Sequence, residues 1–524
     1  YEDRDRAILT DIVDDSSGSL AFAAGVSCVL EDDDEESEAG QTIKDSDTLT
    51  LYNTVQKETY KDVQINPELT LEQQNEIRAL LENYQDIFTD VPKVTNLAEH
   101  HIKLTSKEPV RSKIYPIPYA LEDVIDKEIQ SMLDMGIIER STSGYAAPIV
   151  MVKKPDGTNR VCVNYKQLNK VTVFDTEPMM SADDIFPKLA NSKLYSKFDF
   201  SKGYWQIPMA DESKDVTTFI TRRGAFRFKT MPFGLCNAGS TYNRMMRELL
   251  KGTENLESYL DDVLAHSDSW EHHMAVIKDF FERTRRANLV LRPSKCQIGY
   301  DQVDFLGHRV GIGTIGPKAE LVRKIKEAPR PETKRQVQSF ISLVNFYKEY
   351  IPGRAEIMFP LTGLTKANSS NQVDWTDEHD KAFETLKTRL SSEPVLKLPK
   401  FDREFILQTD ASDKSIGATL LQEYDGMKHP VGFASKKLLP RERNYTVGER
   451  ECLAVIWGVQ KYQRYLYGRH FVLETDHKPL ECLNSNHSQN QRITRWSLSL
   501  APYRFTVKYI RGGDNVIADY MSRA

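Results

Sequence analysis

Asp261 and Asp262 stand side by side, with apolar residues at 259–260 before them and at 263–264 after them. This pattern predicts two half-buried strands joined by a tight turn with the aspartates at its tip. A third carboxylate, Asp199, lies between two phenylalanines in another apolar stretch. Like charges held close resist ionising together, and a bound divalent cation reverses that penalty. An isolated Asp-Asp pair is more often a surface turn, but the apolar flanks favour a metal site.

The charge of the chain is unevenly distributed. Its 524 residues predict about three or four domains. Residues 1–60 hold 16 acidic and 4 basic side chains, a net charge of −12. The net charge of the whole chain is −6, so the remaining residues carry a net charge of +6. We expect 1–60 to be an acidic, disordered linker, because the block at 31–38 is almost entirely Asp and Glu. Two interpretations stay open: a solvated spacer, or a mimic of nucleic acid.

Several classes of protein are disfavoured. The longest nearly apolar run, 20–30, is shorter than the roughly 20 residues that span a bilayer. It also makes a poor signal peptide, because acidic residues precede it. The six cysteines are scattered, with no C-x-x-C, which predicts free thiols in a reducing compartment and no zinc site. A first residue other than Met indicates a piece of a longer precursor.

The periodicity of the chain predicts its elements. A capping box at Thr70 and Gln73 opens a helix, and residues 155–157 (Pro-Asp-Gly) join two strands. Beyond residue 316 the pattern becomes helical, and beyond 399 it becomes that of a mixed α/β domain. The predicted strands are 147–154, 160–164, 404–410, 416–423, 430–434, 470–475 and 503–510; the predicted hairpin is 256–265, and the predicted helices include 318–327, one after Thr333, and 448–465.

A second set of acids lies in the C-terminal part: Asp410, Glu451, Asp476 and Asp519. Each alone is unremarkable, since Asp at the end of a strand is often a cap or a turn residue. Four acids on four consecutive elements of one α/β domain form a pattern that can hold paired metal ions. Such ions can activate water against a phosphodiester.

At this point the sequence resembles the reverse transcriptases of gypsy-type LTR retrotransposons, from about residue 60 to the end. Residues 145–157 and 160–165 look like the fingers hairpin of that family, and 198–207 like its first palm motif. Residues 231–238 look like the next motif, 259–262 like the signature turn, and 305–308 like the primer grip. The block from about 400 to 524 resembles ribonuclease H. Glu451 is preferred to Glu449, because the family's catalytic Glu precedes a small residue, here Ala454, by three.

The resemblance implies a fold class and a domain order. We expect an α+β multidomain protein: a right-hand polymerase with fingers, palm and thumb, followed by an α/β ribonuclease H-like domain. Residues 61–311 would form fingers and palm, 312–400 a helical thumb and connector, and 401–524 the ribonuclease H-like domain. Basic residues of the helical block, among them Lys324 and Arg330, are expected to contact phosphates. A solvated basic helix face is the alternative.

The resemblance also carries substrate-binding residues onto this chain. Lys154 and Arg160 should contact the incoming triphosphate, where a polyanion needs preorganised cations. Tyr204 stands at the place of the sugar gate, which excludes a ribose 2′-hydroxyl. Phe233 and Gly234 should lie near the nascent base pair, where glycine permits close backbone approach. Exposed hairpin charges and core aromatics are the alternative interpretations.

Together these patterns predict an RNA-directed DNA polymerase with ribonuclease H activity. Each active site is expected to use two Mg²⁺ ions, with Mn²⁺ as a substitute. The expected partners are RNA template, DNA primer, RNA–DNA hybrid and dNTPs, with no membrane; a homodimer is one option. The expected location is a cytoplasmic retroelement particle, with the nucleus as a second option. Two alternatives remain: a domesticated nucleic-acid-binding protein without catalysis, and a nuclease whose polymerase half only binds template.

Overall fold

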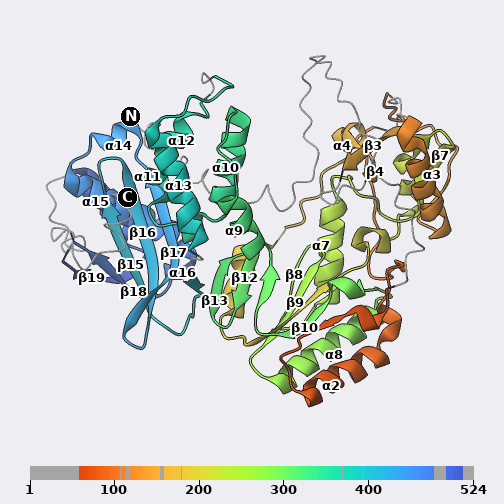
Figure 1. The fold of residues 1–524 in the computed structure, drawn as a ribbon, viewed down its shortest axis with the longest axis horizontal. Helices are drawn as coiled ribbons and strands as arrows, with labels where there is room; N and C mark the ends of the chain where they lie inside the picture. Colours follow the sequence, from red (N-terminus) through yellow and green to blue (C-terminus); the bar gives the residue numbers. More distant parts are fainter. Residues whose placement is uncertain are drawn as a thin grey trace. The chain divides into compact units, whose positions relative to one another are not determined.

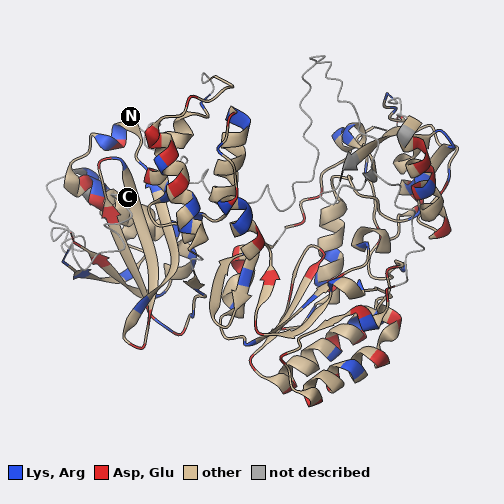
Figure 2. Cartoon of the chain, in the orientation of Figure 1, with Lys and Arg blue, Asp and Glu red and all other residues tan. Residues whose placement is uncertain are grey.

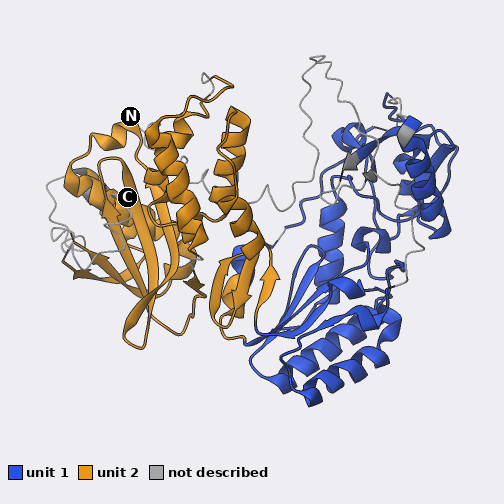
Figure 3. Ribbon diagram, viewed as in Figure 1, with its two compact units in different colours: residues 1–185, 193–301 blue, residues 186–192, 302–524 orange. Residues whose placement is uncertain are grey.

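The computed structural model describes residues 58–106, 108–113, 119–153, 159–178, 180–366, 370–392, 395–476 and 491–511. The chain divides into two compact units (Figure 1, Figure 3). Unit 1 takes the described residues of 1–185 and 193–301, and unit 2 takes those of 186–192 and 302–524. The expected acidic linker lies outside the described residues, apart from 58–60. In the described part of the chain, no helix is both long and apolar enough to cross a bilayer.

One five-stranded sheet of unit 1, named the β5–β9 sheet below, carries the first group of acids. Only β1 and β10 run parallel in it, and the other neighbours are antiparallel. β8 and β9 form the predicted hairpin, with a two-residue turn at 260–261. The strand order is β1 (Gln64–Ile65), β10 (Gln297–Tyr300), β5 (Leu194–Asp199), β9 (Asp262–Ser267), β8 (Leu256–Tyr259).

Aromatic packing joins this sheet to helix α8 (Trp270–Arg286). Apolar residues recur on one face of α8, and its Phe280 and Phe281 are fully buried. The Phe198 ring of β5 lies 5.0 Å from the Phe280 ring and 5.5 Å from the Phe281 ring, centroid to centroid. Helix α2 (Leu71–Asn83), which opens with the predicted capping box, lies beside α8 (Figure 1). This core fixes the strand that ends at Asp199.

A second sheet of unit 1 contains the two strands predicted at 147–154 and 160–164. They pair antiparallel as β3 and β4, and the turn between them lies outside the described residues. The strand order is β2 (Ile138–Arg140), β7 (Gly224–Phe228), β6 (Phe219–Thr221), β3 (Ala147–Lys153), β4 (Asn159–Val163). The other helical elements up to residue 301 are η2 (Tyr60–Asp62), η3 (Gln85–Ile87), α3 (Tyr119–Asp134), α4 (Lys166–Lys170), α5 (Ala182–Ile185), η4 (Phe186–Leu189), η5 (Gly203–Gln206), α6 (Asp211–Lys214), η6 (Asp215–Thr217), α7 (Ala238–Leu249) and η7 (Pro293–Lys295).

Unit 2 begins with a small antiparallel sheet and a helical block. The sheet order is β11 (Val303–Phe305), β12 (His308–Gly311), β13 (Thr314–Pro317), β14 (Leu396–Lys397). The predicted helices at 318–327 and after Thr333 are confirmed, the second with its capping box. The helical elements are α9 (Ala319–Lys326), α10 (Lys334–Phe346), η8 (Lys348–Tyr350), α11 (Arg354–Ile357), α12 (Phe359–Gly363) and α13 (Asp377–Ser391).

The last sheet of unit 2, named the β15 sheet below, matches the predicted order of three strands followed by alternating helix and strand. β15, β18 and β19 run parallel, while β16 and β17 are antiparallel additions. Val455 and Val459 of α15 pack against Leu407 and Leu420 of the sheet. The residues beyond 511, which include Asp519, lie outside the described part of the chain. The elements are β15 (Phe405–Ala411), β16 (Ser415–Tyr424), β17 (Met427–Lys437), α14 (Pro440–Arg443), α15 (Val447–Lys461), α16 (Gln463–Leu466), β18 (His470–Thr475), α17 (Gln491–Leu500) and β19 (Arg504–Tyr509).

Candidate active sites

The first group of acids lies where β5 meets the β8–β9 hairpin. Asp199 ends β5 and stands directly opposite Asp262, the first residue of β9. Asp261 occupies the turn itself. Its neighbour Leu260 has φ +54°, a left-handed conformation that costs a non-glycine residue about 1–2 kcal/mol. The hairpin thus holds a strained tip that carries one carboxylate beside the pair formed by the other two.

Two lysines compensate the charge of this group. Lys295 Nζ lies 2.9 Å from Asp199 Oδ2, and Lys197 Nζ lies 3.0 Å from Asp262 Oδ1. Burial raises the pKa of Asp199; Lys295 opposes this shift, and Asp261 and Asp262 add to it. Asp261 is accessible at the tip, yet protein atoms crowd its carboxylate, and this desolvation raises its pKa, with Asp262 adding to the rise.

The donor set fits a divalent cation. Carboxylate oxygens are the ligands that Mg²⁺ prefers, and crowded acids with raised pKa values gain most from a nearby positive charge. Lys197 and Lys295 now supply that charge. The carboxylate oxygens of these three acids do not all lie within 4.8 Å of one another. Among the described residues, only Asp410, Glu451 and Asp476 meet that condition.

Tyr204, the predicted sugar gate, belongs to an aromatic cluster beside the hairpin tip. The ring of Tyr204 lies 5.0 Å from that of Phe233 and 5.2 Å from that of Tyr242. Burial raises the pKa of Tyr204, and the charge of Asp261 raises it further. Gly234 has φ +92°, and an added Cβ would lie 3.4 Å from the Val163 carbonyl oxygen. Lys154 lies outside the described residues, and only the backbone of Arg160, in β4, is described.

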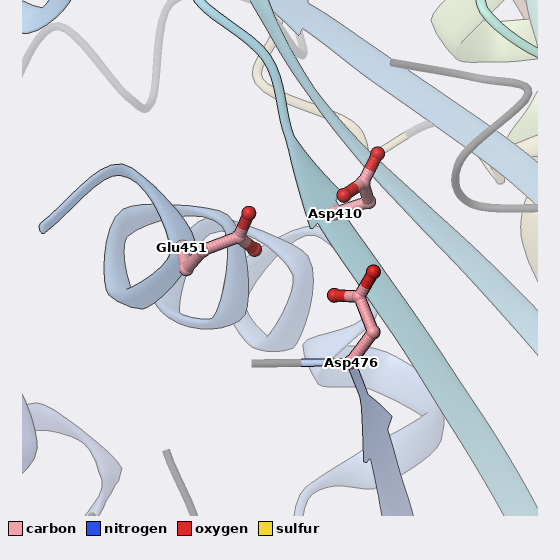
Figure 4. Close-up of side chains that lie close together, drawn as sticks. All are labelled: Asp410, Glu451 and Asp476. Carbon is pink, nitrogen blue, oxygen red and sulfur yellow. The ribbon is translucent and has the colours of Figure 1, made fainter. Parts of the chain in front are cut away.

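The second group of acids converges from three elements of unit 2 (Figure 4). Asp410 comes from β15, Glu451 from α15, and Asp476 directly follows β18. Their ligand atoms all lie within 4.8 Å of one another, so three of the four predicted acids are brought together. Asp519 lies outside the described residues. Tyr509, the last residue of β19, stands opposite Thr475 in the sheet.

Glu451 is the most strongly perturbed member of this group. Burial, followed by the charges of Asp410 and Asp476, raises its pKa to about 9. Its Oε2 atom is buried and has no hydrogen-bond partner in the described part of the chain. An acid held in this way fits a cation as its missing partner. Glu449 instead accepts the Thr446 N–H at 2.9 Å as part of the α15 capping box, and it pairs with Arg492.

Sequence reasoning missed the two lysines and Tyr242. Lys197 could have been found, because it lies two residues before Asp199 on the same face of a strand. Lys295 comes from a different part of the chain, and no local pattern links it to Asp199. Tyr242 lies on α7, and no pattern in the sequence distinguishes it from an ordinary core residue.

Comparisons with known proteins agree with this geometry. A family model described as reverse transcriptase (RNA-dependent DNA polymerase) matches residues 152–310. A model described as an RNase H-like domain found in reverse transcriptase matches residues 375–473. Among solved structures, a foamy viral protease-reverse transcriptase in complex with double-stranded DNA shares the fold, with TM-score 0.78, 22% identity, and coverage of 84% of this chain and 79% of that chain. A structure of that protein with an RNA/DNA hybrid gives TM-score 0.71 at 22% identity, over 85% of this chain and 61% of that one.

Relatives of known sequence are longer polyproteins. The Pol polyprotein from transposon 297 of Drosophila melanogaster is 34% identical over 87% of this chain, which spans 43% of the relative. The Pol polyprotein from transposon 412 of the same species is 33% identical over 91% of this chain, which spans 40% of that relative. The transposon Tf2-3 polyprotein of Schizosaccharomyces pombe is 30% identical over 90% of this chain, which spans 37% of that relative. The chain therefore spans about two fifths of the curated relatives that it matches.

The fold and the matches define a mixed α+β protein in which a reverse transcriptase domain precedes an RNase H-like domain. The chain belongs to the reverse transcriptase and RNase H-like region of LTR retrotransposon Pol polyproteins, with the gypsy-type elements 297 and 412 among its homologues. The resemblance predicted from the motifs is confirmed.

Proposed function

We propose that this chain is an RNA-directed DNA polymerase that also degrades the RNA of an RNA–DNA hybrid. The observation that carries the proposal is the presence of two separate groups of crowded carboxylates, one in each unit. Nucleotidyl transfer and phosphodiester hydrolysis both need such groups to hold paired divalent cations. We further propose domain limits of 61–311 for fingers and palm, 312–400 for thumb and connector, and 401–524 for the nuclease domain.

In the polymerase site, Asp199, Asp261 and Asp262 would hold two Mg²⁺ ions. Bound Mg²⁺ supplies activation of the primer 3′-hydroxyl and neutralises charge on the leaving pyrophosphate. Lys154 and Arg160 bind the triphosphate of the incoming dNTP. Tyr204 excludes a ribose 2′-hydroxyl, and its packing against the Phe233 ring supports this role. Phe233 and Gly234 contact the nascent base pair.

In the nuclease site, Asp410, Glu451, Asp476 and Asp519 would hold the metal ions. The pKa of Glu451, raised to about 9, makes it a poor anion unless a cation arrives, which couples its ionisation to metal binding. Contacts with 2′-hydroxyls and groove shape select the hybrid. The substrates are RNA template, DNA primer, dNTPs and the hybrid, and we propose a cytoplasmic particle, with the nucleus as a second location.

Separate disabling of the two sites tests the proposal. Asp261→Asn should lower extension of an oligo(dT) primer on poly(rA) by more than about a hundredfold and should spare hybrid cleavage. Loss of a group that only supports a metal ligand costs up to about a hundredfold, and loss of a ligand should cost more. Asp410→Asn should have the reverse effect. Asp279→Asn, which removes an exposed carboxylate paired with Arg283, is the matched control and should change neither. Undiminished extension by the Asp261 variant would refute the polymerase assignment.

A further inference from the structure

Two cations of unit 2 lie over one aromatic ring, and the charge of a third cation, Lys366, acts on one of them. Lys437 ends β17, Arg443 ends α14, and Lys366 follows α12, which begins with Phe359. Lys437 Nζ lies 3.7 Å from the centroid of the Phe359 ring, and Arg443 Cζ lies 5.4 Å from it. Figure 2 shows the basic positions of α14 in blue. The ring holds two of the three charges on one side of the unit through cation–π contacts.

No acid compensates this group, named the Phe359 cluster below. In the described part of the chain, none of Lys366, Lys437 and Arg443 forms an ion pair. Lys437 is exposed, yet protein atoms crowd its ammonium group. This desolvation lowers the pKa of Lys437, and the charges of Arg443 and Lys366 lower it further. Several other cations of unit 2 do have acid partners.

The neighbouring basic residues show the contrast. Lys436, the residue before Lys437, has its Nζ 3.7 Å from Glu442 Oε1. Lys324 Nζ lies 2.8 Å from Glu320 Oε1. Arg330 lies 3.3 Å from Asp380. The expected phosphate contacts of Lys324 and Arg330 thus compete with existing acid partners. Crowded cations without an acid repel one another, and an external anion removes that cost.

The Phe359 cluster lies at the same end of the β15 sheet as the nuclease acids. Asp410 stands opposite Gly417, and Gly417 stands opposite Ser435. Lys437 follows Ser435 by two residues and is exposed. Two strand spacings and two residues of rise separate the Cα atoms of Lys437 and Asp410 by roughly 12 Å. A duplex bound at the acids extends far enough to place backbone phosphates at both points.

We propose that Lys366, Lys437 and Arg443 form a binding site for backbone phosphates of the nucleic acid held at the nuclease acids. This inference rests on the proposed function, since it takes the bound polymer to be the hybrid. The contacts would carry no sequence information and would fix the register of the duplex over Asp410. The contacts with the Phe359 ring would hold the two nearest cations in place beside the strand.

The test measures binding, without cleavage. A fluorescently labelled RNA–DNA hybrid is titrated with the full chain in EDTA at several salt concentrations, with fluorescence anisotropy as the readout. Each lost phosphate contact makes the slope of log K against log salt less negative by about 0.9. The double variant Lys437→Gln with Arg443→Gln should therefore change the slope by about 2. Lys461→Gln, which removes an exposed cation paired with Glu349, should leave the slope unchanged.

Two further variants keep the test decisive. Lys437→Arg retains the charge and should retain the slope. If the double variant fails to fold by circular dichroism, Lys366→Gln alone should change the slope by about one unit. An unchanged slope in a folded variant, or an equal change in Lys461→Gln, would overturn the site. The anisotropy assay is independent of the separate cleavage assay in Mg²⁺, so the two proposals can fail separately. A slope change here, together with full cleavage by Asp410→Asn in that assay, would overturn the nuclease assignment and leave this site standing.

Discussion

At the scale of single residues, the Tyr242 hydroxyl is the least expected feature of unit 1. The side chain is fully buried behind Tyr204, and its oxygen has no hydrogen-bond partner among the described residues. A Cβ added at Gly203 would lie 2.7 Å from that oxygen, so the hydroxyl is held closely against the backbone. Burial raises the pKa of Tyr242 well above its ordinary value. The hydroxyl therefore stays neutral and unsatisfied.

Tyr242→Phe should stabilise the protein. An unsatisfied buried hydroxyl costs about 1–3 kcal/mol, and phenylalanine removes it without changing the ring. Urea unfolding of the two proteins measures the difference in stability. The control is Tyr347→Phe, because the Tyr347 hydroxyl donates to the Gly307 carbonyl at 2.7 Å and its loss should destabilise. A less stable Tyr242 variant would mean that the hydroxyl has a partner after all.

At the scale of elements, two tight hairpins of unit 2 share one backbone design. Leu306 and Gly307 join β11 to β12, and Asp425 and Gly426 join β16 to β17; all four have positive φ. This is the pattern of a type I′ turn, which suits the twist of antiparallel strands. The first hairpin is also packed tightly, because a Cβ added at Gly307 would lie 2.8 Å from Phe346 of α10.

Gly307→Ala should therefore destabilise more than Gly426→Ala. Both substitutions place alanine at positive φ, at a cost of about 1–2 kcal/mol. A Cβ at Gly426 meets nothing within 4 Å, so only the Gly307 variant must also displace the Phe346 ring. Thermal melting of both variants measures the difference. Equal losses of thermal stability in the two variants would show that Phe346 moves aside freely and that α10 does not hold the hairpin in place.

At the scale of the whole molecule, three buried histidines make both units sensitive to acid. Burial lowers the pKa of His100, His273 and His308 to about 4 in each case. Their unfolded pKa is about 6.5, so the unfolded chain binds the protons first. The resulting stability is fully present above pH 6.5 and is lost as the pH falls toward 4. Acids with raised pKa values, such as Asp199, act in the opposite direction.

A single substitution isolates one histidine from this balance. His308→Phe keeps a ring against Phe346 and Tyr350 but removes the titrating group. Between pH 6.5 and 5, the variant should gain on the wild type by about 1.4 kcal/mol per pH unit. Urea unfolding at several pH values measures this difference. A constant difference across the range would show that His308 titrates normally in the folded state.

Neighbouring residues in the chain are enough to specify the elements and the acids that the strands carry. Apolar stretches around Asp199 and around the Asp261–Asp262 pair dictate strands and a turn, because alternation and local turn chemistry act over a few residues. The same holds for Asp410 at its strand end and for the capping box at Thr70. These features depend on neighbours in the chain, and they could be predicted.

Which of these groups meet depends on how the chain folds in three dimensions. Lys295 reaches Asp199 because β10 pairs with β5, and nothing local to either residue encodes that pairing. Glu451 joins Asp410 while Glu449 caps its helix, a choice made by the direction in which α15 packs on the sheet. The cluster around Phe359 likewise joins three separate segments. Electrostatic contacts act through space, so the fold, more than the spacing along the chain, sets their partners.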